Sequence, residues 1–230
     1  MLTNYTGTRR DVAVLAHELG HGLHGVLAAP MGYLNMEYPL TMAETASVFG
    51  EALTYDALRA REDDERRQLD LIVSQIDTLV RTALSPIAGN RFEHALHTAR
   101  RAEGDLAVDR INELWLQELG SYWGDAVAEQ DIRATWWSYV PHFVTAPGYQ
   151  YPYAFGLLLS FSIYRRWTQE GESYVEPILD LLRAGSTKPP EELVRGVGFD
   201  LADPGFWNHG LDAIEALVDE AERLADRLGL

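Results

Sequence analysis

Apolar residues recur at helical spacing along most of the chain. In the segment 11–26 they stand three or four residues apart, at Val12, Leu15, Ala16, Leu19 and Leu23. This period predicts an α-helix with one apolar stripe. Thr8 stands where an N-cap residue is expected, and Asp11, three residues later, favours the positive end of the helix dipole.

The same period predicts helices through the rest of the sequence. The segments are residues 41–58, 63–84, 88–98, 106–119, 131–140, 153–168, 174–184, 190–197 and 211–228. Pro86 either ends or only kinks the helix that begins near residue 63. Segments 30–39 and 141–152 contain Pro and Gly and are expected to be loops. We therefore expect an all-α fold in one domain over residues 1–230, with at most a vestigial strand at the N-terminus.

Composition narrows the range of partners. The chain has 230 residues, of which 47% are apolar, enough for a substantial core. Lys and Arg number 19 against 35 Asp and Glu, so the formal net charge is −16. Such a surface repels phosphate backbones and anionic lipids, so neither nucleic acid nor a membrane is an expected partner. No apolar run approaches the roughly 20 residues that a membrane-spanning helix needs.

Cysteine is absent from the sequence. Disulfides and thiolate ligands are therefore excluded, and any metal must be bound by His and carboxylate side chains. A chain without cysteine suits a reducing compartment. The opening sequence MLTNYTGTRR lacks the apolar segment of a secretory signal. We expect a cytoplasmic location.

The sequence HELGH, from His17 to His21, is the strongest chemical signal. Two histidines four residues apart lie on one face of a helix, where both imidazoles can bind one zinc ion. Glu18 projects beside such an ion rather than onto it. There it can take a proton from a water molecule held at the metal, which is the task of a general base in hydrolysis. The alternative is a pair of helical histidines packed near a charged surface.

A zinc ion at this helix needs a third protein ligand. Glu44 is the best candidate, because it opens the next predicted helix, 23 residues after His21. The alternative is a capping box over residues 41–44, in which Glu44 binds the backbone amide of Thr41 instead. Glu51, seven residues further along the same helical face, could orient one of the histidines or simply be solvated.

Several segments together resemble the oligoendopeptidase F family of zinc metallopeptidases, relatives of thimet oligopeptidase and neurolysin. They are NYTGTRRDVAVLAHELGHGLH, AETASVFGEAL, NRFEHALH and LLRAGSTKPPEELVRGVGFDLADPGFW. The resemblance implies that Glu44 completes a zinc site with His17 and His21. It also implies that residues 1–230 are the helical catalytic domain, the C-terminal half of a longer architecture.

The segment VPHFVTAPGYQYPYAFG, residues 140–156, resembles the family's loop of one histidine and several tyrosines. In the family these side chains face the zinc across the cleft and donate hydrogen bonds to the developing oxyanion, a task that suits an uncharged phenol. Carried over by position, His142 and Tyr151 are the first candidates, followed by Tyr149 and Tyr153. The spacing differs by about one residue from the family pattern. The alternative is an aromatic loop packed on a core.

Together these features predict a zinc-dependent endopeptidase acting on oligopeptides, with Glu18 as general base. One alternative is a metallocarboxypeptidase, in which a cation such as Arg91, Arg165 or Arg166 would bind the C-terminus of the substrate. Another is a zinc-binding domain without activity. Family members carry an upstream helical domain and a small sheet, so we also expect self-association or a missing N-terminal half as partner.

Overall fold

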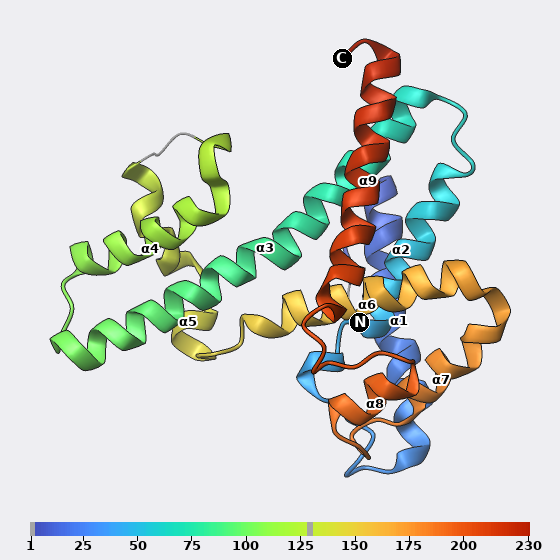
Figure 1. Ribbon diagram of the computed structural model, residues 1–230, viewed down its shortest axis with the longest axis horizontal. Helices are drawn as coiled ribbons and strands as arrows, with labels where there is room; N and C mark the ends of the chain where they lie inside the picture. The colour runs from blue at the N-terminus through green and yellow to red at the C-terminus, as the bar shows by residue number, and fades with distance from the viewer. Residues whose placement is uncertain (1–2, 128–130) are drawn as a thin grey trace. The chain divides into compact units, whose positions relative to one another are not determined.

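The computed structural model describes residues 3–127 and 131–230, and every regular element in these ranges is helical (Figure 1). The all-α prediction is therefore confirmed, and no strand occurs among the described residues. None of the helices in this part of the chain is long and apolar enough to cross a membrane. The α-helices are α1 (Arg9–Ala28), α2 (Thr45–Arg59), α3 (Glu65–Glu103), α4 (Val108–Trp123), α5 (His142–Thr145), α6 (Tyr151–Glu170), α7 (Val175–Arg183), α8 (Pro190–Gly196) and α9 (Phe206–Leu228).

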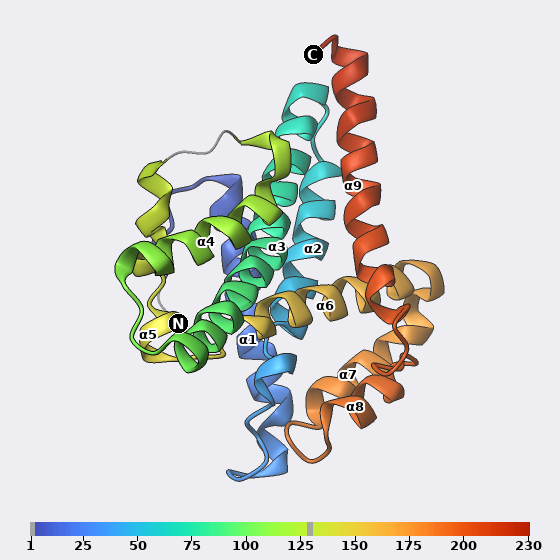
Figure 2. The same ribbon diagram turned by 60° about the vertical axis from the view of Figure 1, so that its left-hand side comes forward.

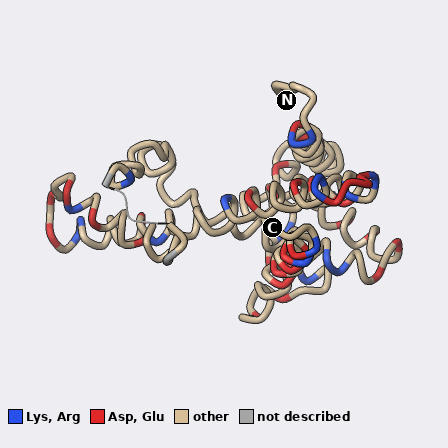
Figure 3. Tube along the Cα trace, turned by 90° about the horizontal axis from the view of Figure 1, so that it is seen from above, with Lys and Arg blue, Asp and Glu red and all other residues tan. Residues whose placement is uncertain are grey.

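The chain forms two compact units, one from Met1–Leu79 with Phe155–Leu230 and the other from Val80–Ala154. In the first unit, α2 lies beside α1 and, on another side, beside α9 (Figures 1 and 2). Acidic residues are concentrated along α9, as Figure 3 shows. The main core of this unit lies between α6, α7, α8 and the start of α9, around Leu159, Ile163, Val194 and Phe206. That residues 1–230 act as one domain remains a prediction.

Helix α1 begins as the sequence predicts. Thr8 is the N-cap residue, and its hydroxyl accepts the backbone N–H of Asp11. The carboxylate of Asp11 accepts the backbone N–H of Thr8 in return, which completes a capping box. The same carboxylate also accepts from Thr6, and these bonds lower the pKa of Asp11. This capping box defines where α1 begins, and therefore on which face of the helix the histidines lie.

The face of α1 that is buried is not the apolar stripe. The buried residues are small or polar, namely Ala13, Gly20, His24 and Ala28. A Cβ atom at Gly20 would lie 2.5 Å from both the carbonyl oxygen of Ala46 and the Cα of Ser47 on α2. One at Gly50 would lie 3.2 Å from the carbonyl oxygen of Ala16. Helices α1 and α2 therefore meet through their backbones.

The apolar stripe of α1 lines an open groove instead. Leu19 and Leu23 are 53% and 50% exposed. They form one wall of a groove of about 580 Å³ to which α2, α6 and α7 also contribute, with Phe49, Trp167 and Ile178 among its residues. The periodicity correctly predicts the helix, but Leu19 and Leu23, the large residues at the end of the stripe, remain exposed in this groove.

Of the two alternatives for Pro86, the structure rules out that it ends the helix, because Pro86 lies inside the continuous helix α3. Two other expectations need correction. Helix α2 begins at Thr45, because residues 40–42 form a separate 3-10 turn. The segment Asp131–Tyr139 is a 3-10 helix rather than an α-helix. Its carbonyl at Arg133 accepts the indole N–H of Trp115 at 3.0 Å, so a tertiary contact supplies a partner for a backbone group of this segment.

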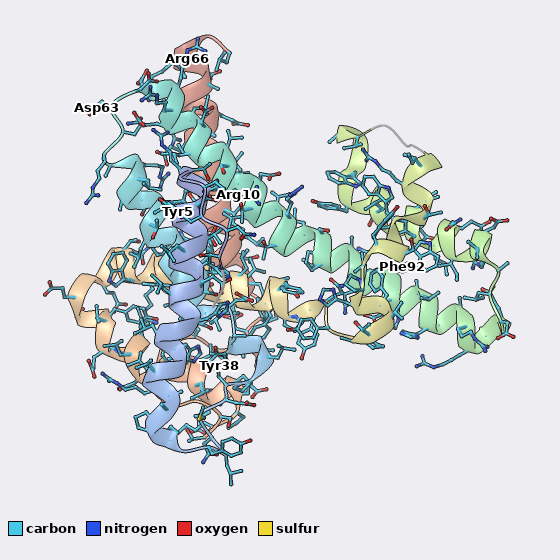
Figure 4. All side chains as sticks on the ribbon, turned by 180° about the vertical axis from the view of Figure 1, so that it is seen from behind. Tyr5, Arg10, Tyr38, Asp63, Arg66 and Phe92 are labelled. Carbon is cyan, nitrogen blue, oxygen red and sulfur yellow. The ribbon has the colours of Figure 1, made fainter. Side chains whose placement is uncertain are left out.

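The second unit has its own aromatic core. Phe92 of α3 is fully buried and lies among Leu114, Trp115 and Leu119 of α4 (Figure 4). The indole N–H of Trp137 donates to the side-chain oxygen of Asn112 at 2.8 Å and ties the 3-10 segment to α4. Phe143, in the short helix α5, packs on the same core.

Candidate metal centre

Helices α1 and α2 bring three potential ligands together. The Nε2 atom of His17 lies 3.3 Å from Oε2 of Glu44, and Nε2 of His21 lies 3.6 Å from the same oxygen. One ligand atom from each of the three residues lies within 4.8 Å of the others. Among the described residues this is the one cluster of His, Asp and Glu with such geometry.

The donor set fits zinc. A tetrahedral ion with bonds of about 2.0–2.1 Å holds its ligand atoms roughly 3.3–3.4 Å apart, close to the two distances to Glu44. Two imidazoles and a carboxylate are also a typical ligand set of catalytic zinc. The three side chains are 26%, 30% and 19% exposed, so a water molecule could reach a fourth position. A structural zinc site would be closed.

Carboxylates hold His17 from both sides. Its Nδ1 lies 3.1 Å from Oε2 of Glu51, the residue that the sequence marks as a partner for a ligand histidine. Burial by itself lowers the pKa of His17, but the bonds to Glu44 and Glu51 outweigh it and raise the pKa to about 9. Without metal, the imidazole therefore carries the proton that a metal ion would displace.

Glu44 is held in place by a residue that the sequence does not single out. The hydroxyl of Ser47 donates to the carboxylate of Glu44 at 2.7 Å. Burial by itself would raise the pKa of Glu44, but hydrogen bonds from His17 and Ser47 outweigh it and lower the pKa. Glu44 is the N-cap residue of α2, not the third residue of a helix capped by Thr41. Its side chain points at the histidines.

Gly156 of α6 lies against Glu44 from another side. A Cβ atom at Gly156 would come within 2.8 Å of the Cβ of Glu44. Only glycine allows α6 to approach the base of the Glu44 side chain this closely. A Gly in an apolar helix is a weak signal, so this contact could not be found from the sequence alone.

His24 and Tyr38 support the segment between the ligands. His24 is only 2% exposed, and its ring stacks on Tyr38 with centroids 3.6 Å apart (Figure 4 labels Tyr38). Burial, with a smaller contribution from His21, lowers the pKa of His24 to about 4. Neutral His24 therefore fastens the loop before Glu44 to the helix that carries His17.

Glu18 is half-buried on α1, directly after His17. A step of one residue turns its side chain about 100° from that of His17, so it cannot share the ligand face. Its position agrees with a role beside the metal.

The second unit gathers three of the four candidate residues of the aromatic loop. The hydroxyl of Tyr153 lies 3.2 Å from Nε2 of His142, and the ring of Tyr149 stacks on that of His142 with centroids 5.3 Å apart. Tyr151 begins α6 and is 49% exposed. The sequence ranks Tyr151 ahead of the other tyrosines, whereas the contacts of His142 are with Tyr149 and Tyr153.

Each arginine that the carboxypeptidase alternative would use has an acidic partner. Arg91 forms an ion pair with Glu118 at 2.8 Å, and Arg165 forms one with Asp212 at 2.5 Å. Arg166 pairs with Glu170 at 2.6 Å and also donates to the carbonyl oxygens of Val197 and Gly198. Because the three guanidinium groups already pair with carboxylates of the chain, they do not favour binding of a substrate's C-terminus, as a carboxypeptidase would require.

Comparison with known proteins gives one consistent match. The model of peptidase family M3 matches residues 1–212. The chain is 26% identical over 227 residues to oligopeptidase PepF of Bacillus subtilis, covering 97% of this chain and 33% of that protein. It is also 26% identical over 229 residues to the chromosomal oligoendopeptidase F of Lactococcus lactis, covering 99% and 38%. The chain thus spans about a third of the length of these curated relatives.

A solved structure shares the fold. Oligoendopeptidase F from Enterococcus faecium superposes with a TM-score of 0.80 at 23% identity, over 95% of this chain and 40% of that one. At this identity the likeness concerns the fold alone. It shows that the helical arrangement described above is also found within a longer protein.

Proposed function

Because this chain belongs to peptidase family M3, we propose that it is a zinc-dependent endopeptidase that hydrolyses peptide bonds in short oligopeptides. The observation that supports this best is that His17, His21 and Glu44 each place a ligand atom within 4.8 Å of the others, with both imidazoles 3.3–3.6 Å from one oxygen of Glu44. The proposed ligands are these three residues. Bound zinc would polarise the scissile carbonyl group and acidify a water molecule.

Glu18 is the proposed general base. Its carboxylate takes a proton from the attacking water and later delivers it to the nitrogen of the leaving amine. A single carboxylate can perform both steps, because it regains its charge when the amine departs. Glu51 keeps the ring of His17 oriented through Nδ1, so that Nε2 is the atom presented to the metal.

His142, Tyr149 and Tyr151 are the proposed donors to the oxyanion of the tetrahedral intermediate, with Tyr153 as a further candidate. The resemblance of residues 140–156 to the family's loop supports this role. Neutral O–H and N–H donors stabilise developing negative charge without repelling a metal ion. The contact between Tyr153 and His142 makes the orientation of the imidazole dependent on the tyrosine.

Metal content tests the ligand set. We expect close to one zinc per chain in wild type and a sharp loss of retention in Glu44→Ala and His17→Ala. Glu37→Ala is the matched control, because Glu37 is an exposed glutamate in the loop before α2. Zinc retention by Glu44→Ala at the wild-type level, with loss in His17→Ala, would remove Glu44 from the ligand set.

Cleavage of paired peptides separates the proposal from its alternatives. An endopeptidase should cleave a quenched oligopeptide and its C-terminally amidated form at similar rates. A carboxypeptidase would lose most of its activity on the amidated form. A zinc-binding domain without activity would retain the metal and cleave neither.

The setting that we propose is the cytoplasm, which agrees with a sequence free of cysteine. The substrates would be peptides already released from larger proteins by other proteases. Further polypeptide from a family-length protein, or a second copy of this chain, is the proposed partner.

A further inference from the structure

Three consecutive residues of α3, Arg91, Phe92 and Glu93, contact three different parts of the second unit. Successive residues of a helix point about 100° apart, so the triplet can reach neighbours on several sides at once. Arg91 forms its ion pair with Glu118 of α4. The metal centre uses none of the three. Phe92 and Glu93 contact the segment that carries His142 and Tyr149.

Phe92 anchors the start of that segment. Its ring is fully buried and meets Phe143 edge to face, with centroids 5.1 Å apart and an interplanar angle of 66°. Phe143 directly follows His142 in α5, a helix of only four residues. A helix this short has little stability of its own, so its position depends on the side chains that it buries. Trp115 completes the aromatic cluster at 5.1 Å from Phe92.

Glu93 anchors the end of the segment. Glu93 is 5% exposed, and its Oε1 accepts the backbone N–H of Gly148 at 2.6 Å. Gly148 has a φ of +82° and directly precedes Tyr149. A bond from an amide to a buried carboxylate is stronger than one between neutral groups, and it compensates part of the cost of burying the charge. His97 lies 3.8 Å from the same oxygen.

The two anchors fix both ends of the stretch from His142 to Tyr149, and they come from adjacent positions of one helix. The two rings at those ends stack on each other. The buried side chain of Gln150 follows and would meet a Cβ at Gly89, one turn before Glu93, at 3.4 Å. The position of the whole stretch therefore depends on contacts with about one turn of α3.

We propose that Phe92 and Glu93 form a positioning clamp, in which Glu93 sets the orientation of His142 relative to Tyr149. This inference rests on the proposed function, because it matters for catalysis only if these two residues are oxyanion donors. Glu93 acts through the backbone of Gly148.

The test compares Glu93→Met, which keeps the side-chain volume but removes the acceptor, with Glu93→Gln, which keeps an acceptor oxygen. The first readout needs no activity. It is the ring-proton NMR shift of His142, assigned with a His142→Gln variant, since stacking on Tyr149 displaces this shift. We expect Glu93→Met to lose the displacement and Glu93→Gln to keep it. Glu113→Met, at an exposed glutamate of α4, is the control and should match wild type.

The second readout is kinetic. A misplacement of about 1 Å in a catalytic group can cost on the order of 100-fold in rate. We expect Glu93→Met to lower kcat by roughly 10- to 100-fold while KM and zinc content stay near wild type. Glu93→Gln should recover most of kcat. If Glu93→Met does not fold, Phe143→Leu loosens the other anchor and should give the same two changes.

The outcomes separate the two proposals. An unchanged His142 shift in Glu93→Met or Phe143→Leu would overturn the clamp, whatever the activity. A lost shift with unchanged kcat would overturn its catalytic importance. If wild type cleaves no peptide, the proposed function fails, and the NMR comparison still decides whether Glu93 positions His142.

Discussion

Glu18 and Glu44 both carry carboxylates near the histidines of α1, but only the carboxylate of Glu44 points at the face of α1 that carries His17 and His21. Glu44 is the N-cap residue of α2, and its Oε2 lies 3.3 Å from Nε2 of His17. Glu18 comes from α1 itself, turned about 100° from His17. We therefore expect substitution of Glu44 to affect metal binding and substitution of Glu18 to affect turnover.

For Glu18 we predict that Glu18→Gln retains zinc and loses hydrolysis. Glutamine keeps the size and hydrogen bonding of the side chain but cannot take a proton. The loss of a positioned base lowers the rate by roughly 100- to 10,000-fold. Zinc analysis and peptide cleavage on the same preparation check this result. Substantial activity in Glu18→Gln would mean that another group is the base.

His24 should make the fold sensitive to acid. Its pKa is about 4 in the folded chain, against an ordinary value of 6.5. As pH falls below 6.5, the unfolded chain binds the proton first. The stabilisation from neutral His24 is thus complete above pH 6.5 and is lost between pH 6.5 and 4. The shift corresponds to about 3 kcal/mol.

The variant His24→Phe keeps a ring to stack on Tyr38 but does not titrate. We predict that its free energy of unfolding falls less steeply than that of wild type between pH 7 and 4, measured with denaturant at each pH. His94→Phe, at an exposed histidine, should follow wild type. Parallel curves for wild type and His24→Phe would show that His24 is not buried in its neutral form.

Sequence spacing predicts the residues of the candidate metal centre that lie close together along one helix. His17 and His21 are one helical turn apart, and spacing alone places them together. Glu51 meets Nδ1 of His17 as its position on the next helix suggests. Glu44 needed the family resemblance, because a capping box fits the same sequence. The contacts of His142 with Tyr149 and Tyr153 depend on how a loop folds back, for which periodicity gives no information.

At the level of elements, the packing of α1 on α2 depends on glycine. We predict that Gly20→Ala destabilises the fold by about 1–3 kcal/mol, the usual cost of overpacking. The added Cβ would meet backbone atoms at 2.5 Å, which cannot move aside as a flexible side chain could. The helices would have to separate by roughly 1 Å, more than the tolerance of a preorganised site. Zinc affinity should fall on the order of tenfold or more.

Gly22→Ala is the matched control, two residues further along the same helix. A Cβ at Gly22 would meet no atom within 4 Å. Alanine is a better helix former than glycine, so this variant should be more stable than wild type by about 1 kcal/mol. Thermal unfolding and zinc titration of the pair check the prediction. Equal behaviour of the two variants would show that α1 and α2 do not meet through their backbones at Gly20.

Helix boundaries show where local reasoning ends. Periodicity predicts the α-helices of the first unit, but it starts α9 at residue 211, five positions late. The first turn of α9 forms because Phe206 packs in the core of that unit, a tertiary contact that periodicity does not reveal. Periodicity predicts the apolar stripe of α1 but does not indicate which residues of α1 pack against α2. The actual contact uses Ala13 and Gly20, since small residues allow the closest approach between helices. A pattern of large apolar residues cannot reveal such a contact.

At the scale of the whole molecule, this chain covers only 33% and 38% of the lengths of the relatives from Bacillus subtilis and Lactococcus lactis. Those relatives therefore extend well beyond the matched region. The groove beside Leu19 and Leu23 leaves apolar surface open in the first unit. Surfaces of this kind in a folded protein usually mark an interface. We expect a segment of the additional polypeptide found in family-length proteins to cover it.

We therefore predict that this chain alone is a weak peptidase even when it is loaded with zinc. Orientation of an extended peptide supplies several kcal/mol of barrier reduction, so turnover as well as KM should suffer without a complete binding surface. The measurement is kcat/KM on a quenched oligopeptide, before and after adding a separately expressed upstream half of a family-length protein, with Glu18→Gln as background. Full activity of the isolated monomer, unchanged by the addition, would contradict this prediction.

The backbone contact between α1 and α2 also bears on metal exchange. Where ligands gather only around the ion, chelation unfolds the protein, because binding energy is folding energy. Here Gly20 and Gly50 fix the separation of the two ligand helices through main-chain atoms. The entropy of ordering the ligands is thus lost when the chain folds, before any ion arrives. If zinc binds as proposed, we expect the ion to leave and return without refolding of the chain. Cobalt(II) should then replace zinc as a visible spectroscopic reporter of the site.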